Sequence, residues 1–536
     1  MNRSRALVTP IFLAACLGLM PAGLASAQTR VVDAARDGNR AAVRRLIQQR
    51  VDVNLPEPDG TTALHWAARG GDTEMVNLLL TSGAKADVAN RYGVTPLALA
   101  AANGDGATIA RLLNAGANVR TAAAEGETAI LLAARSGGVE AIRTLAAHGA
   151  DVNAPETWMG ETPLMWAAAE NNVAAIKTLI ELGAKVGARS GSVKYPAQKP
   201  KDPSNYVASS VPQGQWTPLM YAVREGARDA AFALLDAGAD VNVQDPEGFT
   251  PLLEAIVNGH FDLAAALVQR GADPNRADKS GMAALYAAIE MRTPPWERSR
   301  PDLKEDNDLD CVGLMKVLLD RGADVNKALT GRTLQRYHAG GPAFFGEGTT
   351  PLMRAAKYDN LDMVQLLVAR GADVNRVQPD GTTALMLAAG VKYAITQEGD
   401  PEKAGTVDDA YEIAKLLIDR GADVNAANAK GETALYGAAF TGRSRAVAHL
   451  VERGARLDAR TKTGLTIMDA ALNVGVSDDG TGTRVGGKPG GATVSLVREL
   501  MTKAGLSTDP ARAGDVDVPG TRPTRETPPA RAVAPR

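Results

Sequence analysis

Small apolar residues and leucines recur along this chain in a pattern that repeats about every 33 residues. The stretch "GTTALHWAARGGDTEMVNLLLTSGAKADVANRY", which begins at Gly60, shows one period. The alanine pair Ala67-Ala68 marks one face of a short first helix, and the leucine pair Leu79-Leu80 marks one face of a second. The pattern predicts a helix, a turn, a second helix and a hairpin in each period.

Eleven copies of this unit align, and a truncated copy from Val31 precedes them as an N-terminal cap. The copies begin at Gly60, Gly93, Gly126, Gly160, Gln215, Gly248, Gly281, Gly348, Gly381, Gly431 and Gly464. A single pair of helices with one apolar side cannot bury that side alone, so successive copies are expected to stack.

Local signals mark where the helices of a copy begin and end. A threonine N-cap stands before a proline at the first helical position in Thr162-Pro163, Thr217-Pro218, Thr250-Pro251 and Thr350-Pro351. The second helices are expected to stop at glycines that take a positive φ, at Gly83, Gly149, Gly322, Gly371 and Gly421. Several cues therefore recur in phase.

The period, the "TPLM" and "TALH" openings and the "LL…GADVN" endings resemble the ankyrin repeat over residues 31 to about 506. The resemblance implies an all-α ankyrin-repeat solenoid of about 11–12 repeats, with finger-like hairpins and loop insertions. The family's histidine after leucine is present at His65 but is replaced by Met, Ala or Leu elsewhere. The family's bond between a threonine hydroxyl and an imidazole is thus implied only at His65.

The domain organisation follows from the repeat and its interruptions. It comprises a signal peptide at 1–27, a capping repeat at 28–59, repeats at 60–189, a finger insertion at 190–214, repeats at 215–291, an inter-helix insertion at 292–309, a second helix at 310–326, a finger insertion at 327–347, repeats at 348–506 with inter-helix insertions at 390–408 and 473–491, and a disordered proline-rich tail at 507–536.

The two finger insertions hold aromatic residues in a chain whose aromatic content is only 4%. Finger tips and first helices border the face that the ankyrin family uses to bind partners, and exposed aromatic rings often anchor such contacts. The candidate partner-binding residues are Tyr195, Tyr206, Trp216, Tyr337, His338, Phe344 and Phe345. Two alternatives stand beside this prediction: the insertions are tolerated because longer loops cost little closure entropy, or the rings pack locally as a plug.

The N-terminal stretch indicates export. Arg3 and Arg5 precede an apolar run from Ala6 to Leu19, and the small residues before Gln28 form a cleavage site, so cleavage is predicted after Ala27. The apolar run is too short for a membrane span, which needs about 20 residues. The competing interpretation is a lipoprotein signal in which the "LAAC" stretch presents Cys16 for lipidation.

Composition narrows the classes of partner. Removal of residues 1–27 takes away two arginines and no acid, which moves the formal net charge from −2 to −2 − 2 = −4. This balance argues against a nucleic-acid partner, whose phosphates require concentrated Lys and Arg. The mature chain retains one cysteine, Cys311, and so can form no internal disulfide. We expect Cys311 to be a passive, partly exposed side chain at the start of a second helix.

No catalytic or metal-binding constellation is found. The five histidines, His65, His148, His260, His338 and His449, are dispersed, and no paired His or carboxylate spacing supports a metal site. The recurrent "ADVN" acids and amides are spaced by whole repeats rather than packed into a 12-residue calcium loop, so turn-capping hydrogen bonds explain them better. "DDGTGTRVGGKPGG" lacks the order of a phosphate loop.

These observations predict an exported bacterial scaffold, periplasmic or secreted, that binds an unidentified protein through its concave finger and first-helix face. We expect no catalysis, no cofactor and no metal. Two alternatives stay open. One is an enzyme or small-ligand-binding protein with a site formed by the inserted loops, and the other is a secreted effector that acts on a host protein.

Overall fold

A computed structural model describes residues 30–123, 125–193, 213–292, 307–333, 345–391, 406–472 and 491–510. The predicted leader with Cys16, and the tail beyond residue 510, lie outside these residues. Helices α1 to α24 form twelve consecutive pairs in the described part of the chain, and the only strands there form one short two-stranded pairing. The chain divides into two compact units between Lys279 and Ser280.

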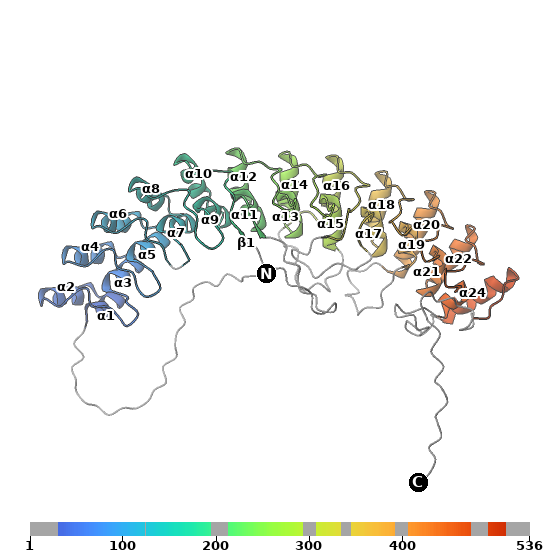
Figure 1. Ribbon diagram of the computed structural model, residues 1–536, viewed down its shortest axis with the longest axis horizontal. Coiled ribbons are helices and arrows are strands. Elements are labelled where there is room, and N and C mark those ends of the chain that lie inside the picture. Colours follow the sequence, from blue (N-terminus) through green and yellow to red (C-terminus); the bar gives the residue numbers. More distant parts are fainter. Residues whose placement is uncertain are drawn as a thin grey trace, which may run out of the picture. The chain divides into compact units, whose positions relative to one another are not determined.

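Unit 1 comprises residues 30–279 and 307–310 of the described chain. Its first helices, α3, α5, α7, α9, α11 and α13, pack side by side in one row, and α4, α6, α8, α10 and α12 form a second row (Figure 1). The elements are α1 Val31–Arg36, α2 Arg40–Gln48, α3 Ala63–Arg69, α4 Thr73–Thr81, α5 Pro96–Ala102, α6 Gly106–Asn114, α7 Ala129–Ser136, α8 Val139–Ala147, α9 Pro163–Ala169, α10 Val173–Glu181, β1 Ser192–Val193, β2 Gln213–Gly214, α11 Pro218–Arg224, α12 Arg228–Asp236, α13 Pro251–Val257 and α14 Phe261–Gln269.

Unit 2 comprises residues 280–292, 311–333 and the described residues from 345 to 510. It has the same two-row arrangement, with α15, α17, α19, α21 and α23 in one row and the even-numbered helices in the other (Figure 1). Its helices are α15 Ala284–Arg292, α16 Cys311–Asp320, α17 Pro351–Lys357, α18 Leu361–Ala369, α19 Ala384–Ala388, α20 Val407–Asp419, α21 Ala434–Phe440, α22 Ser444–Glu452, α23 Ile467–Ala471 and α24 Gly491–Lys503.

Helix ends follow the local signals in the sequence. The Thr250 and Thr350 hydroxyls accept hydrogen bonds from the backbone N–H groups of Leu253 and Met353, each over 3.2 Å. Thr217 caps α11 through its backbone position only, since its hydroxyl makes no cap bond. The five glycines predicted to end second helices all have φ between +85° and +88°, a range that suits glycine.

The core of each unit is built from small aliphatic side chains between the two rows. Ala67, Ala68 and Leu79 are fully buried in the first complete copy, and Leu367 is buried in unit 2. Burying a leucine side chain contributes about 1.5–3 kcal/mol, and alanine pairs let neighbouring helices approach closely. Packing between consecutive copies therefore supplies most of the stability.

The hairpins are joined by a ladder of asparagine side chains. Asn153 Nδ2 donates to Gly183 O over 3.1 Å, and its Oδ1 accepts from Lys185 N over 2.9 Å. Asn54, Asn242, Asn326, Asn375 and Asn425 make the corresponding pair of bonds to the following copy. The aspartates of the "ADVN" endings accept from the backbone N–H two residues later, as Asp151 does from Asn153 over 2.9 Å, and these bonds confirm the predicted turn caps.

Unit 2 contains a largely buried ion pair that spans one whole copy. Arg443, in the turn between α21 and α22, donates two hydrogen bonds to the Asp359 carboxylate, over 2.8 and 3.0 Å. The guanidinium also donates to Ala388 O at the end of the short helix α19. The two residues are 84 positions apart, so this pair links the copies on either side of α19 and α20.

Cys311 differs from its predicted environment. It is the first residue of α16, and its side chain is buried rather than partly exposed. The reason is that α16 begins on the face that packs against α15, so the first side chain of the helix already belongs to the core.

Candidate functional site

The tips of the fingers in unit 1 expose large apolar side chains. Leu55, Tyr92 and Trp158 lie in the fingers before α3, α5 and α9, and their exposed fractions are 47%, 55% and 55%. In unit 2 the described residues include one comparable side chain, Val377, which is 52% exposed. Binding residues are often carried on loops that a rigid scaffold positions, so the fingers of unit 1 form a candidate binding surface.

A second apolar row runs along the first helices beside these fingers. The seventh residue of each copy, counted from its first position, is Trp66, Leu99, Leu132, Trp166 and Tyr221 in α3, α5, α7, α9 and α11. Trp66, Leu99 and Trp166 are half-buried, whereas Leu132 and Tyr221 are buried. Neighbouring first helices contact one another, so the row is continuous. We call this row and the three finger tips the aromatic face.

Trp66 is held rigidly within the aromatic face. Its indole Nε1 donates to Glu57 Oε2 over 3.1 Å, and Glu57 also receives a hydrogen bond from Arg36. The Arg69 guanidinium lies over the indole ring, 5.5 Å from the ring centroid. The ring therefore keeps one orientation, with a carboxylate at its edge and a cation on one face.

Trp166 repeats this arrangement three copies later. Its Nε1 donates to Glu161 Oε2 over 2.8 Å, and Arg135 lies 4.9 Å above the ring. Glu161 Oε1 accepts a further bond from the Tyr221 hydroxyl over 2.8 Å. Burial raises the pKa of Glu161, although the bonds from Tyr221 and Trp166 oppose this shift.

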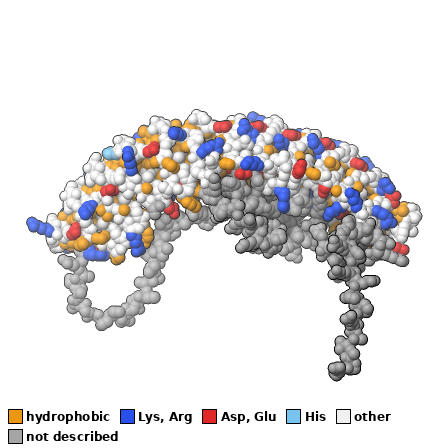
Figure 2. All heavy atoms as spheres, in the orientation of Figure 1, with side chains coloured by type: hydrophobic (Ala, Val, Ile, Leu, Met, Phe, Trp, Pro, Cys, Tyr) orange, Lys and Arg blue, Asp and Glu red, His pale blue; other side chains and the backbone are white. Residues whose placement is uncertain are grey.

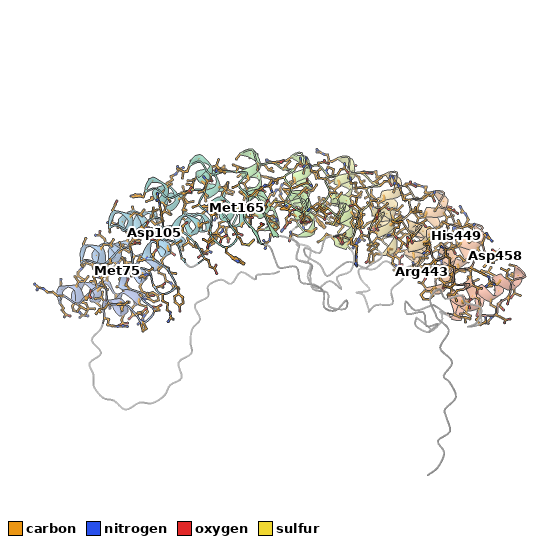
Figure 3. All side chains as sticks on the ribbon, viewed as in Figure 1. Met75, Asp105, Met165, Arg443, His449 and Asp458 are labelled. Carbon is orange, nitrogen blue, oxygen red and sulfur yellow. The ribbon has the colours of Figure 1, made fainter. Side chains whose placement is uncertain are left out.

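Trp216 makes a third set of the same contacts but lies deeper. Its Nε1 donates to Asp245 Oδ2 over 3.3 Å, and Arg224 lies 5.5 Å from the ring. The ring packs edge-on against Tyr221 in a cluster with Met165 and Met220, and is 7% exposed. Met165 can be located on α9 in unit 1 (Figure 3).

In unit 2 the seventh residue of each copy is buried, and none of these residues is aromatic. Arg354 replaces the aromatic residue on α17 and is almost fully buried beside Glu290, at 3.4 Å. Its guanidinium donates to the Tyr286 hydroxyl and lies over the rings of Tyr286, Phe345 and Tyr358. Because these groups are buried against one another, the cluster stabilises the packing of unit 2 and is not a contact surface.

Two of the candidate partner-binding rings can be located, and both are buried. Trp216 belongs to the cluster above, and Phe345 is 3% exposed, 5.8 Å from Tyr358 between ring centroids. Both rings are thus local packing groups, because the helices beside them supply apolar partners. Tyr195, Tyr206, Tyr337, His338 and Phe344 lie outside the described residues, and their role stays a prediction.

The sequence carried a signal for the aromatic face that was not used. Trp66 and Trp166 stand at the same position of their copies, and Tyr92 and Trp158 each precede or nearly precede the first glycine of a copy. Aligning the copies and asking where large side chains stand at variable positions would have found them. Tyr92 and Trp158 lie in fingers of regular length, whereas the predicted rings lie in or beside the insertions.

On the face shown in Figure 2, the charged side chains of the described residues form no patch of a single sign. Lys and Arg are interspersed with Asp and Glu over the visible surface of each unit (Figure 2). Within the described residues, no group of three or more His, Cys, Asp and Glu side chains is arranged to hold a metal ion. The described helices also include none that is long and apolar enough to cross a membrane.

Comparison with known families explains the repeat. The family described as "Ankyrin repeats (3 copies)" matches residues 31–123, 99–190, 219–295 and 304–397, and "Ankyrin repeat" matches residues 380–429. The chain belongs to the ankyrin-repeat family. Ankyrin repeats indicate a scaffold for protein–protein interaction, and this is the general function of the chain.

One solved structure similar to this ankyrin-repeat chain is the human ASB11 ankyrin repeat domain. The two sequences are 27% identical, and the match covers 46% of this chain and 100% of the ASB11 domain, with a TM-score of 0.38. No curated protein matched this chain.

The contact that the ankyrin family implies at His65 is present. The Thr62 hydroxyl lies 2.8 Å from His65 Nδ1, and His65 Nε2 lies 3.0 Å from Val94 O in the next copy. In α23 the carboxylate of Asp469 takes the place of the imidazole and accepts a 2.6 Å bond from the Thr466 hydroxyl. The polar contact is thus kept where a suitable acceptor follows the threonine.

Proposed function

We propose that this ankyrin-repeat protein is a non-catalytic scaffold that binds a protein partner through the aromatic face of unit 1. The observation that carries the proposal is the pairing of exposed Tyr92 and Trp158 on the finger tips with half-buried Trp66 and Trp166 on the first helices. A few aromatic anchors commonly provide most of the free energy of a protein–protein contact.

Preorganisation supports this assignment. The indole N–H groups of Trp66 and Trp166 are already bonded to Glu57 and Glu161, so partner binding freezes little additional side-chain motion. The supporting helices are packed on both sides by their neighbours in the row. A rigid surface of this kind suits equilibrium binding.

Other classes of function receive no support from the described residues. The described histidines make local structural contacts, as His65 does with Thr62 and His148 Nδ1 does with Thr144 O. On the face shown in Figure 2, the interspersed charges form no continuous basic surface for nucleic-acid phosphates, and the low net charge of the chain points the same way. We therefore assign neither catalysis nor nucleic-acid binding to the scaffold.

The proposed location is the bacterial cell envelope. It is supported by the positive, apolar and small-residue segments of the leader at residues 1–27. Cell fractionation followed by N-terminal sequencing of the recovered protein tests this assignment. A chain that begins at Gln28 in the periplasmic fraction agrees with it, and recovery of the uncleaved chain from the cytoplasm contradicts it.

Photo-cross-linking in cells tests the binding surface directly. A photoreactive amino acid is placed at Tyr92 or Trp158, and in matched controls at Asn77 or Lys177, which are exposed on the second-helix row. We expect a discrete cross-linked protein from positions 92 and 158 only. Cross-links of equal yield from positions 77 and 177 would show that the aromatic face is not the binding surface.

A further inference from the structure

We propose that the partner of the aromatic face presents an extended, acid-rich polypeptide segment, whose carboxylates bind Arg69, Arg135 and Arg224. This inference rests on the proposed function and names the chemistry of its partner. It begins from a recurrence in the structure. Trp66, Trp166 and Trp216 each have an arginine guanidinium over the indole ring.

The three arginines occupy one position of the repeat. Each is the tenth residue of its copy and lies in the last turn of α3, α7 or α11. All three are exposed, and the side chains of Arg135 and Arg224 are 46% and 41% accessible. An exposed guanidinium presents N–H edges to solvent, and these edges match the two oxygens of a carboxylate.

The carboxylates of this face are already committed to other donors. Glu57 accepts from Trp66 and Arg36, and Glu161 accepts from Trp166 and Tyr221. Glu161 is also largely buried, and burial raises its pKa. These acids therefore fix the rings in place. Within the described residues neither acid forms a hydrogen bond or ion pair with Arg69, Arg135 or Arg224, although the charge of Arg224 lowers the pKa of Glu161 and so partly opposes the effect of burial.

The ion pairs that the arginines make within the chain are loose. Arg135 lies 3.8 Å from Glu127, and Arg224 lies 3.7 Å from Glu225, both at exposed sites. No ion pair involves Arg69 within the described residues, where its contact is the Trp66 ring. Exposed pairs at such distances are weak in water, so a partner carboxylate can replace them.

The spacing of the arginines predicts the pattern of the bound segment. Two helix-to-helix steps separate the helices that carry Arg69 and Arg135, and two more lead to Arg224; the helices between them, α5 and α9, carry Leu99 and Trp166. Packed helices lie about 8–10 Å apart, so successive arginines are roughly 16–20 Å apart. An extended chain covers this distance in about five or six residues. Acidic residues at that interval, with apolar residues between them, would fit.

The structural alternative is that the arginines serve only their own helices. A cation in the last turn of a helix interacts favourably with the helix dipole, and its stem covers apolar surface. Under this alternative, loss of the arginines changes stability slightly and leaves binding preferences unchanged. A binding readout separates the two interpretations.

Selection from a library of displayed random 16-residue peptides against the purified mature chain tests the proposal. We expect the selected peptides to be enriched in Asp and Glu interleaved with apolar residues, and their binding to weaken as salt rises. A soluble selected peptide should lose at least tenfold in affinity for the triple variant R69Q/R135Q/R224Q. The triple lysine variant, which keeps the charge but loses the planar fork, should bind with intermediate affinity.

The matched control removes three exposed arginines from the second-helix row, in the triple variant R111Q/R143Q/R228Q. This control changes the net charge equally and should retain the affinity of the parent chain. Far-UV circular dichroism of both triple variants verifies that each remains folded.

Several outcomes would overturn the inference: selection of basic or neutral peptides, no enrichment at all, or equal affinity in both triple variants. These failures differ from failure of the proposed function. If positions 92 and 158 still cross-link a partner while R69Q/R135Q/R224Q binds it normally, the scaffold function stands and the acidic chemistry is wrong. Loss of the positional preference in cross-linking would contradict the function itself.

Discussion

At the scale of the residue, the asparagine of the "ADVN" ending shows how one amide connects two copies. Asn425 donates to Gly454 O over 3.0 Å and accepts from Arg456 N over 2.9 Å. Its own backbone N–H donates to Asp423 Oδ1, which fixes the turn. The amide side chain thus donates to one backbone group of the next copy and accepts from another, while the Asp423 carboxylate caps the turn itself.

Replacement of Asn153 by alanine should destabilise unit 1. The variant loses the bonds to Gly183 O and Lys185 N, and a net hydrogen bond contributes about 0.5–1.5 kcal/mol, so we expect a loss of about 1–2 kcal/mol. Urea unfolding followed by tryptophan fluorescence measures it. Asn77→Ala is the control, since Asn77 is exposed and its side chain bonds only Arg111 among the described contacts. Equal effects of the two changes would contradict the ladder's role.

His65 should make unit 1 sensitive to mild acid. Burial lowers the pKa of His65 below the value of about 6.5 that it has in the unfolded chain. Its contribution to stability is therefore complete above that value and is lost as the pH falls toward the folded-state pKa. We expect the urea concentration at the unfolding midpoint to decrease as the pH is lowered from 7.5 to 5.5. The decrease should be smaller in His65→Met.

The methionine variant is a control that the chain itself supplies. Met165 occupies the same position in α9, where its sulfur lies 3.3 Å from the Thr162 backbone nitrogen. Since methionine does not titrate, the difference between the two pH profiles isolates the histidine. An identical acid response in both proteins would assign the effect to carboxylates instead.

The residue scale also shows how far site prediction from sequence could go. Aromatic residues were correctly singled out as scarce, but Trp216 and Phe345 turned out to be buried. The exposed Trp158 and Tyr92 stand in regular fingers of normal length. Composition shows that a ring is present, whereas its exposure depends on which neighbouring helices surround it.

At the scale of the element, the fingers require a left-handed residue where each copy begins. Ten of the eleven copies have glycine there, and Gln215 takes the same conformation with a φ of +55°. The Gln215 backbone N–H donates to Gly191 O over 2.9 Å beside the β1–β2 pairing, which holds the strained residue in place. The enlarged finger thus ends at a strained residue, Gln215, where the other copies have an unstrained glycine.

Gln215→Gly should therefore stabilise unit 1. A left-handed conformation costs a non-glycine residue about 1–2 kcal/mol, and the greater unfolded-state freedom of glycine offsets about 0.5–1 kcal/mol of that gain. We expect a net stabilisation of about 0.5–1 kcal/mol, measured by thermal unfolding. Gly83→Ala is the opposite control, since Gly83 has a φ of +87° and open space around its Cβ position. A lower melting temperature for Gln215→Gly would refute the strain.

At the scale of the whole molecule, the division at Lys279 and Ser280 was not visible in the repeat. The copies continue in register on both sides of it, and the helix pairs are of the same kind. In repeat proteins each copy contacts only its neighbours, so cooperativity between distant copies can fail wherever one interface is weak. The two units are accordingly candidates for separate unfolding.

Two probes should report different unfolding transitions. Four of the five tryptophans, Trp66, Trp158, Trp166 and Trp216, lie in unit 1, whereas helices are present in both units. In the Trp296→Phe variant, fluorescence reports unit 1 alone and far-UV circular dichroism reports both units. We expect urea curves from the two signals not to coincide. Superimposable curves would show that the chain unfolds as one cooperative block.

The sequence by itself determined the helix pairs, the fingers, the turn caps of the "ADVN" endings and the ankyrin-repeat family. These features depend on apolar periodicity, caps and left-handed glycines, which act within one copy or between adjacent copies. Only the tertiary structure decided which rings are exposed, where Arg354 is buried and that Arg443 pairs with Asp359 across 84 residues. Burial and ion pairing are properties of the surroundings of a side chain, and those surroundings come from parts of the chain that no local pattern brings together.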